Sequence, residues 1–152
     1  MWTKKVKDAT AYVCGLGFYE FSLNGEKVGD SEFAPLWSDY DKSVYYNTYD
    51  VTSQVKKGGN AIGVLLGNGF YNVQGDRYRK LQISFGAPTL RFRMVVNYED
   101  GTSETIVSGK DWKYDFSPVL FNCIYGGEDY DARREQKGWN MFGLKSRIGV
   151  LS

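Results

Sequence analysis

The stretch from 45 to 71, YYNTYDVTSQVKKGGNAIGVLLGNGFY, most constrains how this chain can fold. Aromatic and β-branched residues reach strand density over 45–50. Asp50 and Thr52 are residue types that often begin a helix, and Val51 and Val55 lie four positions apart. Together they predict one short helical turn that ends at Gly58-Gly59. The nearly unbroken apolar run at 61–66 is typical of a strand buried on both faces. We therefore expect this run at the centre of a β-sandwich.

Strand signals precede this stretch. Residues 9–14 are typical of a first strand, and Tyr19, Phe21 and Leu23 alternate with polar residues in a second. Asn24-Gly25 supplies the positive φ angles of a two-residue hairpin turn, so 26–28 should return as the partner strand.

Strand signals also follow it. Residues 89–98 alternate most clearly, and Asp100-Gly101 predicts a hairpin with 103–107. Further short strands are expected at 112–114 and 119–121, and an irregular chain beyond 124. No helix longer than two turns is expected. About eight strands with turn signals between them predict an all-β chain, an antiparallel jelly-roll β-sandwich.

Length and chemistry narrow the class further. The chain has 152 residues and a hydrophobic content of 42%, ordinary for one globular domain. Its aromatic share of 16% suits an all-β core or a carbohydrate-facing surface. A net charge of +1 gives no reason to expect nucleic acid or an anionic membrane. No apolar run is long enough to span a bilayer, and no signal peptide opens the chain.

Histidine and cysteine usage excludes several chemistries. The chain has no histidine, which removes Ser-His-Asp and Cys-His catalysis and histidine metal ligation. The two cysteines, Cys14 and Cys123, both lie in apolar strand-like stretches and outside any CxxC. Buried free thiols and an inter-strand disulfide both remain open.

Two long irregular segments hold the candidate binding residues. The first, 29–42, carries Asp30, Trp37, Asp39 and Tyr40, and the second, 67–86, carries Asn68 and Tyr71. Such loops are uncommon unless they are functional or packed by their own aromatic residues. The aspartates could equally stabilise loop turns while the aromatic rings cover the sandwich end. The basic residues at 77–80 are expected to be a solvated loop.

An ordered set of motifs resembles one known family. GLGFYEFSLNGEKVGD, WSDYDK, YNTYDVT and GNAIGVLLGNGFY, followed by DGTSETI, DWK and YGGEDYDAR, resemble the N-terminal β-sandwich domain of bacterial α-L-rhamnosidases, glycoside hydrolase family 78. The resemblance spans about 9–139. The hairpin and core motifs also resemble the galactose-binding-like sugar-binding domains of family 2 glycosidases, but WSDYDK and GEDYDAR favour the rhamnosidase side.

The resemblance implies an accessory domain. In such enzymes a separate (α/α)₆ barrel hydrolyses terminal α-L-rhamnose from glycosides, by an inverting mechanism that needs two separated carboxyl groups. This chain alone is then expected to have no glycosidase activity and to dock against the other domains of its parent, helping substrate approach. A periplasmic or secreted parent is favoured. Glu128, Asp131 and Arg133 are expected to form ion pairs or cap turns at the domain boundary.

The resemblance also implies a second possibility, a carbohydrate-binding module. Some similar domains bind terminal L-rhamnose, or a related sugar, together with calcium, which takes six to eight oxygen ligands. Candidate sugar-binding residues here are Asp30, Trp37, Asp39, Tyr40, Asn68 and Tyr71, and Asp30 and Asp39 are the candidate calcium ligands. The binding members use an adjacent Asp-Asn pair, which this sequence lacks.

The domain is expected to span 1–140. Residues 141–152 depart from the usual acidic continuation of the family, so they are expected to form an atypical tail, poorly ordered or engaged with another chain.

Overall fold

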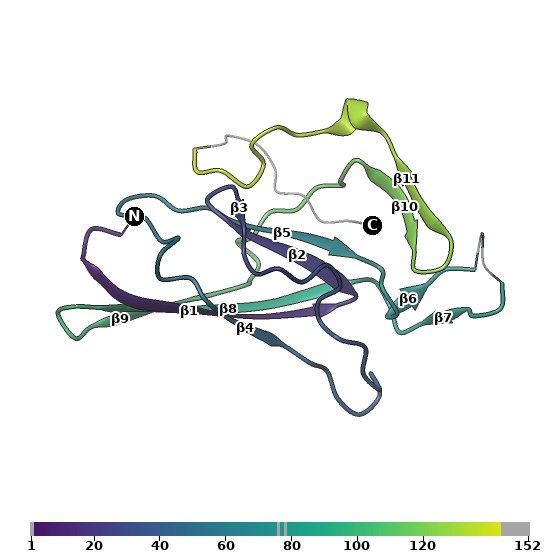
Figure 1. Ribbon diagram of the computed structural model, residues 1–152, viewed down its shortest axis with the longest axis horizontal. Helices are drawn as coiled ribbons and strands as arrows, with labels where there is room; N and C mark the ends of the chain where they lie inside the picture. Colours follow the sequence, from purple (N-terminus) through teal and green to yellow (C-terminus); the bar gives the residue numbers. More distant parts are fainter. Residues whose placement is uncertain (1, 76, 78, 144–152) are drawn as a thin grey trace.

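The structure is a computed structural model that describes residues 2–75, 77 and 79–143, and within them it is almost entirely strands and loops (Figure 1). Every strand pairing is antiparallel. In chain order the elements are β1 (Val6–Leu16), β2 (Phe18–Leu23), β3 (Glu26–Lys27), β4 (Asn47–Asp50), β5 (Ile62–Gly67), β6 (Asn72–Val73), β7 (Ile83–Ser84), β8 (Thr89–Tyr98), β9 (Ser103–Val107), β10 (Val119–Cys123), β11 (Gly127–Tyr130) and a single 3₁₀ turn η1 (Ala132–Arg134). The expected all-β antiparallel fold is therefore confirmed.

Two main sheets form the sandwich. One has the strand order β4-β1-β8-β9 and the other the order β3-β2-β5, and β6-β7 and β10-β11 are separate hairpins (Figure 1). The chain crosses from the first sheet to the second at Gly17, between β1 and β2. Gly17 has a φ of 112°, and a Cβ there would lie 2.1 Å from the carbonyl oxygen of Gly67. Only glycine permits this crossing.

The core lies between these two sheets. Inward residues of β1 and β8 meet inward residues of β2 and β5 in one cluster, which also takes in Val51 from the turn after β4. Phe21 and Phe92, from opposite sheets, lie with ring centroids 5.4 Å apart, and Met94 is fully buried beside them. This cross-sheet packing is the hydrophobic burial that holds the two sheets together.

The predicted turns form where expected. Asn24 and Gly25 have φ angles of 56° and 86°, as a two-residue hairpin turn requires. After β4, the backbone N–H groups of Gln54 and Val55 both donate to the carbonyl of Val51, which makes the expected single turn. The chain then leaves this turn at Gly58, whose φ is 99°.

The apolar run at 61–66 is a strand but not a central one. In the described residues β5 pairs with β2 alone and so lies at the edge of its sheet. A non-strand segment covers part of its outer face: a Cβ at Gly63 would lie 2.6 Å from Asn140 and 2.8 Å from the Trp139 ring. The continuous apolar pattern therefore reflects burial on both faces, as expected, although β5 is an edge strand of its sheet.

Two other expectations need correction. Residues 112–114 form no strand, since Trp112 instead packs as a loop residue against Phe92, with centroids 5.3 Å apart. The chain beyond 124 is not wholly irregular, because β11 returns along β10 as a hairpin.

Cys14 and Cys123 are both free, so the disulfide alternative is excluded. Over the described ranges, no helix is long and apolar enough to cross a membrane. Within the expected tail, a Cβ at Gly59 would meet the Phe142 ring at 2.0 Å, so Phe142 lies directly on the 58–59 turn. Residues 144–152 lie outside the described residues.

Candidate functional site

The two long loops meet at one end of the sandwich through stacked aromatic rings. Trp37 of the first loop stacks on Phe70 of the second, with centroids 4.7 Å apart and planes 14° apart. Phe70 contacts Phe18 and Tyr125 edge-on, each at 6.0 Å. Phe33 packs on Phe18 at 5.4 Å. These contacts hold both loops in one arrangement.

Much of this cluster faces solvent. The exposed fractions are 76% for Leu36, 65% for Phe33, 57% for Trp37 and 51% for Tyr125. We call the surface formed by Phe33, Leu36, Trp37, Phe70 and Tyr125 the loop-end surface. Exposed large apolar residues that adjoin one another are unusual on a monomer and mark interaction sites.

Tyr40 and Tyr71 form a second, half-buried aromatic group with Phe85. The Tyr40 ring lies 5.0 Å from Tyr71 and 5.3 Å from Phe85, and the Tyr71 hydroxyl donates to the Phe85 carbonyl at 3.1 Å. Burial raises the pKa of Tyr40. The structure thus brings these two predicted residues together, in an arrangement in which each ring packs on the others.

Asn68 is buried in an amide network. Its backbone N–H donates to Oδ1 of Asn122 at 2.8 Å, and its side chain donates to the Asn122 carbonyl at 2.9 Å. Its own Oδ1 accepts from Asn72 at 2.8 Å. With only 3% of its surface exposed, Asn68 connects the second loop to β10.

The two candidate calcium ligands do not converge with other carboxylates. The Asp39 carboxylate accepts from Lys42 Nζ at 2.7 Å, and its carbonyl accepts from the N–H groups of Lys42 and Ser43. Asp30 is exposed at the other end of the same loop. The described residues contain no group of three or more His, Cys, Asp or Glu side chains that could hold a metal ion.

A cleft of about 400 Å³ lies beside the loop-end surface, between β2 and the β10–β11 hairpin. Phe33 lines it together with Glu20, Glu32 and Glu128. Lys27 pairs with Glu32 at 2.7 Å and with Glu20 at 3.7 Å. This cleft was not predicted from the sequence. Glu20 was visible only as an outward residue of an alternating strand, and nothing in the sequence placed Glu128 opposite it.

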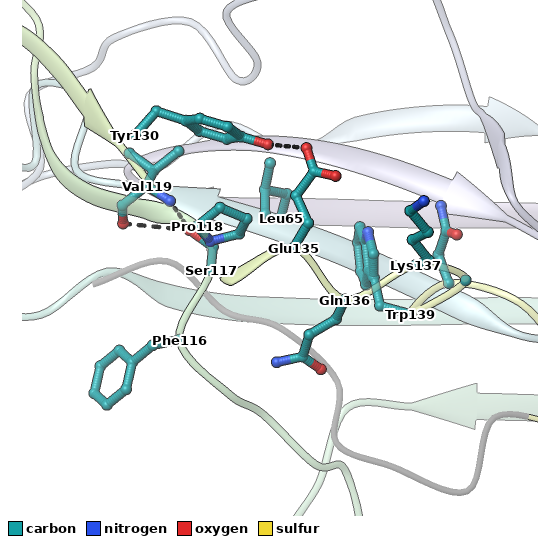
Figure 2. A pocket seen from close by; sticks show the side chains of 12 residues that line it. Leu65, Phe116, Ser117, Pro118, Val119, Tyr130, Glu135, Gln136, Lys137 and Trp139 are labelled. Atoms are coloured by element: carbon teal, nitrogen blue, oxygen red, sulfur yellow. Dashed lines mark hydrogen bonds between the residues drawn. The ribbon is translucent and has the colours of Figure 1, made fainter. Parts of the chain in front are cut away.

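A second groove, of about 380 Å³, lies over β5 and is lined by residues near η1 (Figure 2). The Tyr130 hydroxyl points to and donates to the carboxylate of Glu135, and this bond raises the pKa of Tyr130 (Figure 2). Ser117 Oγ accepts from the Val119 N–H at 2.9 Å, so the groove wall is fixed. Leu65 and Trp139 also line it.

The boundary residues near η1 interact locally. Asp131 accepts from the N–H of Arg133 at 3.1 Å and pairs with its guanidinium at 2.8 Å. The hydrogen bonds from the side chain and then the backbone of Arg133 lower the pKa of Asp131. Asp129 pairs instead with Arg77, whose guanidinium lies 4.5 Å from the Phe121 ring centroid.

These features define an all-β sandwich module with a preformed aromatic surface at one end. Residues 4–148 match the sequence profile of the α-L-rhamnosidase N-terminal domain. The chain therefore belongs to the α-L-rhamnosidase N-terminal domain family.

Relatives agree with this assignment. An α-L-rhamnosidase of Formosa agariphila is 47% identical over 140 residues, covering 90% of this chain and 15% of that protein. An α-L-rhamnosidase of Streptomyces avermitilis is 42% identical over 144 residues, covering 95% of this chain and 14% of the relative.

Solved structures agree as well. The crystal structure of Streptomyces avermitilis α-L-rhamnosidase complexed with L-rhamnose is similar with a TM-score of 0.89 and 40% identity, over 97% of this chain and 14% of that one. The α-L-rhamnosidase from Dictyoglumus thermophilum is similar with a TM-score of 0.85 and 40% identity, over 99% of this chain and 16% of that one. The chain thus spans about 15% of the length of the curated relatives that it matches.

Proposed function

We propose that this chain is a non-catalytic accessory domain of an α-L-rhamnosidase, which docks through its loop-end surface against other domains of the parent enzyme and helps shape substrate approach. The observation that carries the proposal is the exposure of Leu36, Phe33 and Trp37, at 76%, 65% and 57%, on one continuous end of the sandwich. Aromatic residues are enriched at the buried centres of protein interfaces.

The loop-end surface is already ordered in the isolated domain. Trp37 is held by its stack on Phe70, and Phe33 by Phe18. Binding through such a surface loses little conformational entropy, since its rings need no further ordering. This rigidity supports docking as a rigid body.

The carboxylates of the cleft support a non-catalytic role for this domain. An inverting glycosidase needs two carboxyl groups free to act on either side of a scissile bond. In the cleft, Glu32 and Glu20 both pair with Lys27. The catalytic step then belongs to another part of the parent enzyme.

The test uses Leu36→Asp in the parent enzyme and in this chain alone. Leu36 is largely exposed, so the isolated domain should keep its stability to within about 0.5 kcal/mol. In the parent, a charge inside the interface should lower the melting temperature of the docked unit and kcat/KM on an α-L-rhamnoside. Tyr114→Asp, at a residue that is 71% exposed elsewhere, is the matched control and should change neither. A parent enzyme unaffected by Leu36→Asp would contradict docking through this surface.

A second candidate function is carbohydrate binding in the cleft. Its support is the exposed ring of Phe33 beside Glu32 and Glu128, a flat apolar face next to carboxylate acceptors. Sugar sites combine these two features, an apolar stacking face and a few placed polar groups. The Streptomyces avermitilis relative was solved in complex with L-rhamnose, which makes that sugar the first probe.

Calorimetric titration with L-rhamnose, with and without millimolar calcium, tests this candidate. Binding in the cleft predicts heat that is lost in Phe33→Ala and reduced in Glu32→Gln. Calcium-dependent heat lost instead in Asp30→Ala or Asp39→Ala would move the site to the first loop. No heat in either condition would exclude sugar binding by the isolated domain and leave docking as the function.

A further inference from the structure

The outer face of the four-stranded sheet carries two neighbouring arginines. Phe92 and Met94 of β8 point into the core, so the alternation of the strand places Arg91 and Arg93 on the opposite face. Both arginines are exposed. As i and i+2 residues on one strand face, they lie about 7 Å apart along β8.

These arginines line a shallow hollow together with aromatic rings. The hollow has a volume of about 620 Å³, and its walls include Tyr12, Tyr46 and Val107. Tyr12 is the cross-strand partner of Arg93, which pairs on its other side with Val107. The two tyrosine rings lie 6.2 Å apart at 58°, and Tyr46 is 64% exposed.

The positive charge of the hollow is not neutralised by any ion pair among the described residues. Six other cations form ion pairs, namely Lys4, Lys5, Lys27, Lys42, Arg77 and Arg133. No carboxylate of the described residues lies within ion-pair distance of Arg91 or Arg93.

The carboxylates of this face lie toward its other end. Asp50 is the cross-strand partner of Thr10, and Asp8 accepts a hydrogen bond from Asn97. The sheet face therefore has an acidic end and a basic end, and the tyrosines lie at the basic one.

We propose that this hollow binds an acidic oligosaccharide through the carboxylates of its uronic acid residues. A guanidinium matches a planar carboxylate with two parallel hydrogen bonds, and two guanidinium groups at this spacing suit an anionic sugar chain. The rings of Tyr12 and Tyr46 offer apolar faces for the sugar rings, and their hydroxyl groups can accept and donate hydrogen bonds.

The size of the site favours a saccharide over an acidic protein. A hollow of this volume falls within the range of small-ligand sites, about 300–1,000 Å³. The site is on the sheet face rather than at the loop-end surface, so it does not rest on the docking proposal, and its failure would leave that proposal intact.

The experiment is calorimetric titration of the chain with a tetrasaccharide of galacturonic acid at low ionic strength. The comparison ligands are its carboxyl-reduced, neutral counterpart and poly-glutamate of matched charge. We expect binding to the acidic tetrasaccharide alone, with affinity that falls as salt is added.

The key variant is Arg91→Gln/Arg93→Gln, and its matched control is Lys56→Gln/Lys57→Gln, which removes the same charge from the exposed turn after β4. The arginine variant should weaken binding about tenfold or more, because it removes charge-assisted hydrogen bonds. The lysine variant should keep wild-type affinity. Tyr46→Ser should weaken binding severalfold. Unchanged thermal unfolding in each variant checks the fold.

Three results would overturn the proposal. Equal weakening in the arginine and lysine variants would reduce the binding to net charge. Equal affinity for the neutral tetrasaccharide would remove the role of the carboxylates. Tighter binding of poly-glutamate, or no binding of the acidic tetrasaccharide at all, would exclude an acidic sugar as the occupant.

Discussion

Asn24 should be one of the most sensitive positions outside the apolar core. Its side chain donates to the carbonyl of Gln54 at 2.9 Å and to Oδ1 of Asn60 at 2.7 Å, and it accepts from the N–H of Ala61 at 2.9 Å. It is 8% exposed and has a φ of 56°. One residue thus forms the hairpin turn and connects it to the chain entering β5.

Two substitutions separate these roles. Each lost hydrogen bond costs about 1 kcal/mol, so Asn24→Gly should lower the free energy of unfolding by about 2–3 kcal/mol while keeping the turn conformation. Asn24→Ala loses the same bonds and adds the strain of a Cβ in the left-handed region, about 1 kcal/mol more.

Urea unfolding followed by tryptophan fluorescence measures both values. Glu26→Ala, an exposed neighbour in the same hairpin, is the control and should change stability by less than about 0.5 kcal/mol. Wild-type stability in Asn24→Gly would refute the role of the side-chain network. Equal stability of the glycine and alanine variants would refute the role of backbone strain.

Three further predictions follow from buried groups. Burial, and then the hydrogen bond to Glu104, raise the pKa of Tyr98 from 10.0 to about 12. The folded state therefore holds the phenol proton more tightly, so the contribution of Tyr98 to stability is fully present below pH 10 and is lost as pH rises from 10 towards 12. A urea series against pH measures this fall, and Tyr98→Phe should make it shallower. Phe21→Ala should cost about 3–5 kcal/mol by denaturant unfolding, since Phe21 is 1% exposed, and Phe21→Leu should cost less. Asn68→Ala should cost about 2 kcal/mol in the same assay, because the Asn122 carbonyl loses its side-chain donor and the Asn72 amide loses its acceptor, and in Asn68→Asp the side chain should keep only the acceptor for Asn72.

The strands were predictable where local signals and tertiary burial agree. The alternation of β8 follows directly from one buried and one wet face, and its turn at Asp100-Gly101 fixes the register with β9. The apolar run of β5 predicted burial on both faces but not the position of the strand in its sheet. Its outer face is covered by Trp139 and Asn140, far along the chain, and periodicity cannot tell which element provides such cover.

The candidate site was predictable only in part. The sequence identified the two loops and their aromatic residues, since long unstructured loops rich in rings must pack on something. It did not predict that Trp37 would pack on Phe70, or that Tyr40 would pack on Tyr71 and Phe85. Those pairings depend on how two loops approach in space. The cleft beside Phe33 was missed for the same reason, because Glu128 reaches it from a hairpin that the sequence did not reveal.

Asn68 shows how the docking surface depends on buried polar groups. The sequence suggested that Asn68 binds a sugar. In the structure Asn68 instead holds the second loop to Asn122 of β10. Phe70, two residues on, is the ring on which Trp37 stacks. The orientation of the exposed aromatic surface therefore depends on an amide network in which Asn68 and Asn72 are buried. Loss of that network should disorder the loop-end surface before it unfolds the sandwich, because the core between β1, β8, β2 and β5 does not include it.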